Sequence, residues 1–190
     1  LAAWRRGSVA CATRTPSPEV IAFTRPVPDS ITECELTHLA RHPIDVANAR
    51  RQHTEYERVL RTLGCDVRQL PALHDHPDSV FIEDTALVFD ECAVITRPGA
   101  ESRRGETASV AEALRPLRRL YHIEGPGTLD GGDVVRLGKR LYVGASMRSN
   151  EDGARQLADA LAAHGYPVTR TPMLGWLHLK TAVSTLPGDV

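Results

Sequence analysis

The sequence lacks the long apolar run that a membrane span requires. No stretch of its 190 residues approaches the roughly 20 consecutive apolar residues that cross a bilayer. Its first twelve residues combine basic and small side chains without a sustained apolar core, which matches a secretory signal poorly. An initiator Met is also missing, so we expect a processed chain or a fragment. No membrane partner is expected.

Closely spaced cysteines are absent as well. Cys11, Cys34, Cys65 and Cys92 form no CxxC pair, which argues against a zinc site. Four cysteines in a chain of this length do not make a disulfide scaffold, so reduced thiols in a cytoplasmic protein are expected. We predict no metal and no cofactor.

The sequence has no excess of basic residues. Its formal net charge is -1, and its arginines are dispersed along the chain. A general nucleic-acid binder needs clustered Lys and Arg to neutralise phosphates, so no nucleic-acid partner is expected. With 42% hydrophobic and 25% charged residues, the composition is that of an ordinary globular protein with one domain, or at most two.

The first part of the chain predicts a leader followed by a strand, a helix and a strand. Residues 1–19 are rich in Arg, Ser, Thr, Pro and Ala without periodicity, so we expect a disordered leader. Residues 20–24 are a short apolar run and predict a buried strand. Apolar residues between 44 and 63, among them Tyr56, Val59, Leu60 and Leu63, follow one helical stripe, and residues 65–70 alternate as a strand.

The rest of the chain repeats one pattern. Two β-type runs with a short turn, a helix and another strand occur over residues 86–123, and again over residues 134–171. A supersecondary unit that recurs at about 45 to 50 residues is typical of propellers and arrays. Alternation over residues 176–180 predicts a further strand, and another hairpin is expected to begin at residue 180. We therefore expect residues 20–190 to form an incomplete α/β propeller domain whose last unit lacks a partner strand.

Charged residues gather at the turns of this pattern. Asp78, Glu83 and Asp84 flank a short apolar run and could bind a guanidinium through paired hydrogen bonds, although loop solvation and strand capping explain them too. Arg103 and Arg104 follow a Pro-Gly turn, where a guanidinium could hold a carboxylate; a solvated patch is the plainer interpretation.

Two further residues could take part in chemistry. Asp130 precedes a Gly-Gly pair, which permits a close approach of the backbone to a ligand, or forms a simple hairpin turn. His178 lies on the predicted strand over residues 176–180 and could transfer protons near neutral pH. A structural histidine is the alternative.

Several segments together carry a resemblance. PDSVFIED, ITRPGAESRRGE, LDGGDV, YVGASMRSN and LHLK, in this order and at these separations, resemble the dimethylarginine dimethylaminohydrolases of the guanidino-group-modifying, or pentein, superfamily. The resemblance implies an α/β propeller of five ββαβ-type units with a site in its central channel. Its last unit is expected to be incomplete in this chain.

The resemblance also implies roles for the charged residues around a guanidinium. Asp78 and Asp84 would hold the guanidinium of a methylated arginine, with Glu83 in support. Asp130 would orient it during attack. His178 would be the general acid and base.

At the amino-acid end of the substrate, the resemblance implies a second set of contacts. Arg103 and Arg148 would bind the α-carboxylate. The main chain near Leu36 and Leu177 would receive the rest of the amino-acid group.

The implied reaction needs a cysteine thiolate that attacks the guanidinium carbon, and citrulline and an alkylamine are its products. All four cysteines of this sequence lie in the wrong motifs, so the nucleophile is expected beyond Val190 and the 190-residue chain is expected to be inactive. An arginine deiminase and a catalytically inactive guanidinium-binding protein are the alternatives. The oligomeric state is left open, with a homodimer among the options.

Overall fold

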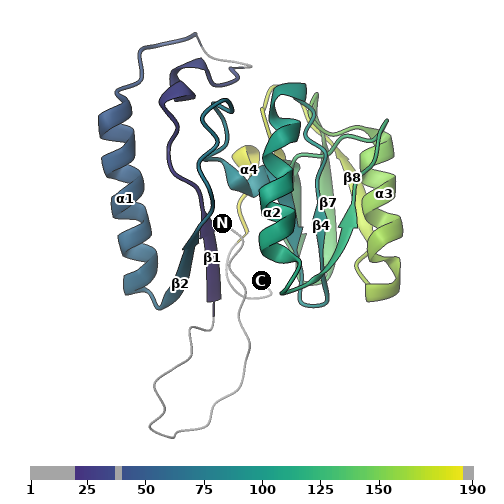
Figure 1. The fold of residues 1–190 in the computed structure, drawn as a ribbon. Coiled ribbons are helices and arrows are strands. Elements are labelled where there is room, and N and C mark those ends of the chain that lie inside the picture. Colours follow the sequence, from purple (N-terminus) through teal and green to yellow (C-terminus); the bar gives the residue numbers. More distant parts are fainter. Residues whose placement is uncertain (1–19, 37–39, 186–190) are drawn as a thin grey trace, which may run out of the picture. The chain divides into compact units, whose positions relative to one another are not determined.

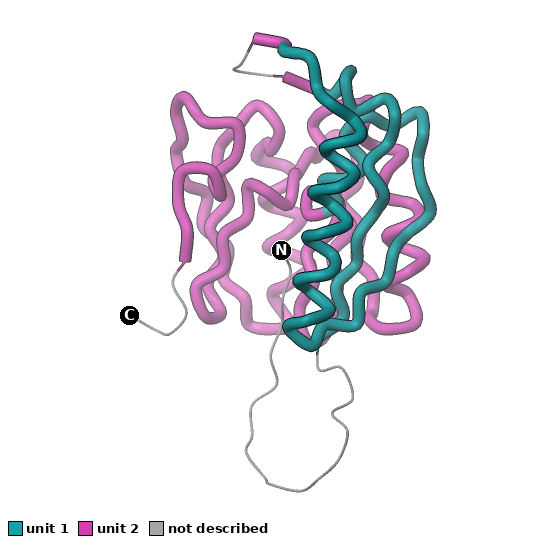
Figure 2. The backbone as a smooth tube through the Cα atoms, turned by 90° about the vertical axis from the view of Figure 1, so that its left-hand side faces the viewer, with its two compact units in different colours: residues 1–34, 42–82 teal, residues 35–41, 83–190 magenta. Residues whose placement is uncertain are grey.

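The structure is a computed structural model that describes residues 20–36 and 40–185. These residues form two compact units (Figure 2). Unit 1 contains residues 20–34 and 42–82, and unit 2 contains residues 35–36, 40–41 and 83–185. The predicted leader over residues 1–19 lies outside the described residues. The single domain expected over residues 20–190 stays a prediction.

Unit 1 is a strand, a helix and a parallel strand. β1 (Val20–Thr24) pairs with β2 (Cys65–Gln69), and α1 (Val46–Thr62) connects them (Figure 1). The Asp45 side chain accepts a hydrogen bond from the Asn48 N–H at 2.9 Å and so caps the start of α1. The predicted strand, helix and strand are confirmed, but the first strand is not the buried one that was expected, because Thr24 is its one buried residue.

The buried face of α1 differs from the predicted apolar stripe. Leu63 is 74% exposed and Val59 41% exposed, whereas Glu57 is buried. Glu57 can be buried because its carboxylate accepts hydrogen bonds from Thr24 at 2.6 Å and Gln69 at 3.0 Å, and from Arg61 at 3.2 Å. An acid with its hydrogen bonds satisfied therefore lies on the sheet side of the helix, and Leu60 is the part of the expected apolar stripe that is buried.

Unit 2 contains the repeated pattern twice. In each copy two antiparallel strands are followed by a helix and by a third strand parallel to the second, so the predicted hairpin, helix and strand repeat is confirmed. The first copy is β3 (Ala86–Val88), β4 (Cys92–Ile95), α2 (Thr107–Leu114) and β5 (Arg119–His122). The second is β6 (Val134–Leu137), β7 (Arg140–Ala145), α3 (Glu151–Leu161) and β8 (Val168–Pro172).

One hydrophobic core joins the two copies. Side chains of β4, β7 and α3 lie in a single buried cluster with residues of the connecting loops. Leu157 and Leu161 of α3 have no exposed surface, and neither do Cys92 and Val94 of β4. The two sheets of unit 2 are therefore stabilised by the same set of contacts.

The region after β8 is not the predicted strand. Residues 173–178 form no strand, and α4 (Leu179–Ala182) is a short helix where the start of a hairpin was expected. The Thr181 hydroxyl accepts a hydrogen bond from the His178 N–H at 3.3 Å, a capping contact that favours a helical turn. Both predictions for residues 176–185 are wrong. Residues 186–190 are not described.

Candidate active site

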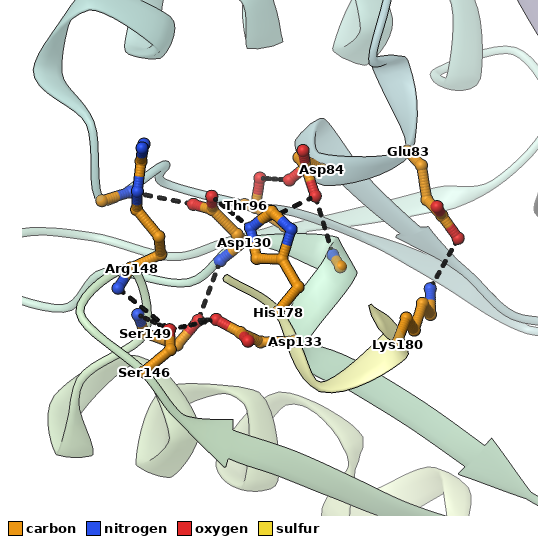
Figure 3. Close-up of polar contacts among 12 residues, drawn as sticks. Glu83, Asp84, Thr96, Asp130, Asp133, Ser146, Arg148, Ser149, His178 and Lys180 are labelled. Atoms are coloured by element: carbon orange, nitrogen blue, oxygen red, sulfur yellow. Dashed lines mark hydrogen bonds and ion pairs between the residues drawn. The ribbon is translucent and has the colours of Figure 1, made fainter. Parts of the chain in front are cut away.

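Unit 2 brings Asp84, Asp130 and His178 together (Figure 3). Nε2 of His178 lies 3.1 Å from Oδ2 of Asp130 and 4.0 Å from Oδ1 of Asp84. Asp130 has no exposed surface and Asp84 is 7% exposed. Two carboxylates that lie 48 residues or more from the histidine in the sequence thus approach the same imidazole ring.

Asp130 is held by the backbone of neighbouring loops. It follows Leu129, which forms an isolated β-bridge with Arg97, two residues after the end of β4. Its Oδ1 accepts a hydrogen bond from the Gly99 N–H at 2.9 Å, while its Oδ2 contacts His178. The contact with His178 supports a role in orienting the imidazole ring, and the predicted contact of Asp130 with the guanidinium stays a prediction.

Asp84 lies in the 3-10 turn Ile82–Thr85. Its Oδ1 accepts from the Gly132 N–H at 2.8 Å and its Oδ2 from Arg103 at 2.7 Å. The Thr96 hydroxyl donates to the Asp84 carbonyl at 2.6 Å and fixes the turn against the end of β4. Asp84 is therefore anchored through both its main chain and its side chain.

Arg103 is buried between two acids. Its Nη1 donates to Asp84, and its Nε and Nη2 donate to the two oxygens of Glu106 at 3.1 and 3.0 Å. Burial alone would lower the pKa of Arg103, but the adjacent Glu106 and Asp84 outweigh it and raise the pKa. The predicted contact with a substrate carboxylate stays a prediction. The geometry supports another role, that of a brace for Asp84.

Glycine is required beside this cluster. A Cβ on Gly132 would lie 2.7 Å from both Oδ1 of Asp84 and Nδ1 of His178, and a Cβ on Gly131 would lie 2.2 Å from the Glu83 carbonyl oxygen. The Gly-Gly pair therefore leaves room for the main chain of Glu83 at Gly131 and for the side chains of Asp84 and His178 at Gly132.

His178 takes up protons more readily than an ordinary histidine. Burial would lower its pKa, but the hydrogen bond with Asp130 and the negative charges of Asp84, Asp133 and Asp130 outweigh that effect and raise the pKa. A histidine of this kind can carry a proton near neutral pH and release it to a base.

The remaining predicted residues lie in varied surroundings. Glu83 accepts a hydrogen bond from Lys180 at 2.7 Å, and both side chains are partly exposed (Figure 3). Arg148 and Leu177 are half-buried, and Leu36 is 41% exposed. Asp78 is buried in unit 1, in the turns after β2.

The cysteines differ in burial. Cys92 has no exposed surface and belongs to the core of unit 2, and burial raises the pKa of its thiol. A raised pKa disfavours the thiolate, so Cys92 is a poor nucleophile. Cys34 is buried and Cys65 partly buried in unit 1, and Cys11 lies outside the described residues.

Sequence reasoning missed a second layer of the site. Asp133, Ser146 and Ser149 are joined by hydrogen bonds beneath Asp130 and His178 (Figure 3). All three lie inside the motifs LDGGDV and YVGASMRSN, but a serine hydroxyl in a loop gives no sign of its partner. Only the folded chain places them together.

Three of the site's groups also have the spacing of metal ligands. One oxygen each of Asp84 and Asp130 and one ring nitrogen of His178 lie within 4.8 Å of one another. The two carboxylates already accept hydrogen bonds from Arg103, Gly132 and Gly99. We assign no metal to this cluster.

Among the described residues, none of the helices combines the length and the apolar composition that a membrane span needs.

Comparison with known proteins identifies the family. Residues 33–174 match the profile of the family described as N,N dimethylarginine dimethylhydrolase, eukaryotic. The chain belongs to the dimethylarginine dimethylaminohydrolase (DDAH) family. It is 41% identical to the DDAH of Pseudomonas aeruginosa over 171 residues, which cover 88% of this chain and 65% of that protein. It is 43% identical to the DDAH of Streptomyces coelicolor over 164 residues, 86% of this chain and 63% of that protein.

A solved DDAH shares the fold. A mutant of the Pseudomonas aeruginosa DDAH complexed with citrulline superimposes with a TM-score of 0.80 at 40% identity, over 84% of this chain and 63% of that one. The α/β pentein fold class predicted from the sequence is thereby confirmed. The chain spans a little under two thirds of the length of the DDAH proteins that it matches.

Proposed function

We propose that this chain carries the guanidinium-binding and proton-transfer groups of a dimethylarginine dimethylaminohydrolase. Such an enzyme hydrolyses asymmetric dimethylarginine and monomethylarginine to citrulline and a methylated amine. The observation that carries the proposal is the position of His178, whose Nε2 lies 3.1 Å from Asp130 and 4.0 Å from Asp84 in a largely buried site. Membership of the DDAH family supports it.

Charge favours a cationic substrate. The cluster contains four buried carboxylates, those of Asp84, Glu106, Asp130 and Asp133, and one buried guanidinium, that of Arg103. Buried charges of one sign in excess attract a ligand of the other sign, and a planar guanidinium can donate two parallel hydrogen bonds to a carboxylate. Asp84 is the acceptor that we assign to the substrate, with Glu83 in support. Asp78 belongs to unit 1, and its predicted contact with the guanidinium stays a prediction.

The amino-acid end of the substrate takes a separate set of contacts in this proposal. Arg148 binds the α-carboxylate, and the main chain near Leu36 and Leu177 receives the rest of that group. Arg103 braces Asp84, because its three guanidinium nitrogens already donate to Asp84 and Glu106.

His178 performs the two proton transfers. A cysteine thiolate attacks the guanidinium carbon, and the bond from that carbon to the dimethylamino nitrogen breaks as protonated His178 gives this nitrogen a proton. Neutral His178 then takes a proton from water, whose oxygen attacks the same carbon. The carbon–sulfur bond breaks as the remaining hydroxyl proton passes to solvent, where the released amine takes one up, and citrulline and the thiolate are formed. Asp130 orients the imidazole in both steps. The thiolate comes from a cysteine other than the buried Cys92.

Calorimetric titration of the 190-residue chain tests the binding half of this proposal. We expect asymmetric dimethylarginine and methylguanidine both to bind, and Asp84→Asn to weaken both by about tenfold or more, since a charge-assisted hydrogen bond is lost. Asp159→Asn, which changes an exposed acid of α3, is the matched control and should bind like the parent. Lack of binding by the parent, or equal affinities of parent and Asp84→Asn, would contradict the proposal.

The same titration tests Arg148. Arg148→Met should weaken dimethylarginine strongly and leave methylguanidine, which has no carboxylate, nearly unchanged. Equal losses for the two ligands would remove Arg148 from the proposed carboxylate contact.

A further inference from the structure

Asp133 is a fully buried carboxylate at the centre of the polar network of unit 2 (Figure 3). It ends the 3-10 turn Gly131–Asp133, directly before β6. Its Oδ1 accepts a hydrogen bond from the Leu179 N–H at 3.1 Å. Its Oδ2 accepts from the hydroxyls of Ser146 at 2.5 Å and Ser149 at 2.7 Å. One carboxylate thus connects two segments that are far apart in the sequence.

The first segment is the loop that carries Arg148. The Ser146 hydroxyl donates its proton to Asp133, so its lone pairs are left to accept from the N–H groups of Arg148 at 2.9 Å and Ser149 at 3.2 Å. The Ser149 hydroxyl likewise accepts from the Asp130 N–H at 3.1 Å. Asp133 therefore sets the orientation of two hydroxyls that hold the loop on both sides of Arg148.

The second segment is the start of α4. Leu179 is the residue directly after His178, and its N–H is the group that Asp133 accepts from. Thr181 caps the same turn through the His178 N–H. The position of the His178 ring relative to Asp130 consequently depends on where Asp133 holds the backbone of the next residue.

The surrounding chain makes room for this arrangement. A Cβ on Gly144 of β7 would lie 3.2 Å from Oδ1 of Asp133 and 3.0 Å from Cβ of Leu179. Both distances are shorter than most contacts that Cβ atoms make in proteins. Burial raises the pKa of Asp133, against the lowering effect of Ser146 and Ser149, so its negative charge is held at an energetic cost. A costly buried charge with a complete set of donors is typical of a group that fixes a site.

We propose that Asp133 is a positioning residue. It fixes the turn that carries His178 relative to the loop that carries Arg148, so that both can contact the bound substrate. The identity of the substrate rests on the proposed function, and the links from Asp133 to His178 and Arg148 rest on the geometry of unit 2. Asp133 touches neither substrate nor reacting atoms in this scheme; it acts through Leu179 on one side and through Ser146 and Ser149 on the other.

The proposal has two arms, the link from Asp133 to His178 and the link from Asp133 to Arg148. Titration of His178 by NMR tests the first arm without any ligand. Asp133→Asn should lower the pKa of His178, because one of the negative charges that favour the imidazolium is removed while those of Asp84 and Asp130 remain. Asp133→Glu, which keeps the charge, should retain more of the parent value than Asp133→Asn. Asp152→Asn, an exposed acid of α3, is the control and should leave the titration unchanged. A folded Asp133→Asn variant with the parent titration curve would overturn this arm.

Ligand preference tests the second arm. The preference is the ratio of the affinity for dimethylarginine to the affinity for methylguanidine. This ratio should fall about tenfold in Asp133→Asn, since the loop that carries Arg148 loses an acceptor with a full charge. An unchanged preference in a folded variant would overturn the link to Arg148.

A second variant covers the case in which Asp133→Asn does not fold. Ser146→Ala keeps the Asp133 charge and its bond with Ser149, but removes the hydroxyl through which Asp133 holds the Arg148 N–H, so the ligand preference should fall while the pKa of His178 stays at the parent value. If Ser146→Ala leaves the preference intact, the position of Arg148 does not depend on its link to Asp133 through Ser146, and the second arm of the proposal is overturned. A parent chain that binds neither ligand would refute the proposed function instead, and the His178 titration would still decide the first arm.

Discussion

At the scale of single residues, Arg103 and its two acids form a buried ion group that depends on all three members. The exposed fractions of the side chains are 5% for Arg103, 10% for Asp84 and 1% for Glu106. Water therefore cannot solvate an acid that loses its partner. Removing one member of a buried pair leaves an uncompensated charge, which costs far more than the pair itself contributes.

Arg103→Met should lower the free energy of unfolding by about 3–5 kcal/mol, because Asp84 and Glu106 are left unpaired. Urea denaturation measures this change. Arg155→Met is the matched control: Arg155 is 60% exposed and pairs with Asp152 on the surface of α3, and loss of such a surface pair costs at most about 1 kcal/mol. Similar losses in the two variants would show that Arg103 is not a structural brace.

Sequence alone makes Arg103 a candidate ligand for a carboxylate, with a solvated patch as the plainer interpretation, and it does not predict a buried ion group. The Pro-Gly turn and the adjacent arginines indicate a cation at the start of a helix. Glu106 lies three residues later, where a 3-10 turn brings side chains together, so this half of the group could have been found. Asp84 lies 19 residues earlier on another turn, and only the tertiary packing brings it to Arg103.

At the scale of elements, Asn150 connects the start of α3 to a loop. Its Oδ1 accepts from the Gly153 N–H at 2.9 Å, which caps the helix, and from the Thr128 N–H at 3.0 Å. Its Nδ2 donates to the Pro126 carbonyl at 2.9 Å. One amide thus satisfies two backbone donors and one acceptor that would otherwise be unpaired.

Asn150→Ala should therefore destabilise the chain by about 1–2 kcal/mol, at the upper end of the range for a lost helix cap. Urea denaturation again gives the value. Asn150→Asp is the control, because a carboxylate still accepts from Gly153 and Thr128 and loses only the bond to Pro126. We expect Asp to retain most of the stability that Ala loses; an equal loss in both variants would assign the effect to the Pro126 contact.

Elements with clear end signals are the ones that the sequence predicts. α1 begins after Asp45 and ends near Gly64, and α3 begins after Asn150, as the capping residues indicate. α4 has four residues, too few for a helical period to be recognised. Trp176 and His178 before this helix and Lys180 within it alternate with leucines, a pattern that a strand and an irregular segment can share.

At the scale of the molecule, the repeat is visible in the sequence but the way its copies pack is not. Apolar runs and turns give the order of β3 to β8, because each run is short and bounded. Nothing in that order states that the leucines of α3 belong to one buried cluster with strands of both copies. For the same reason the meeting of Asp84, Asp130 and His178 followed from the resemblance and not from spacing.

The shared core makes one prediction about unit 2 as a whole. Leu157 of α3 has no exposed surface and belongs to the cluster that contains Val94 of β4 and Val143 of β7. Leu157→Ala should lower the free energy of unfolding by about 2–5 kcal/mol, because it leaves a cavity in that cluster. Hydrogen exchange should show the amides of β4 and β7 losing protection together, since both strands depend on the same contacts.

The control is Leu137→Ala, the same change at a half-exposed site of β6, which should alter the free energy of unfolding by no more than about 0.5 kcal/mol. Loss of protection in β7 with β4 unaffected would mean that the two copies are stabilised separately.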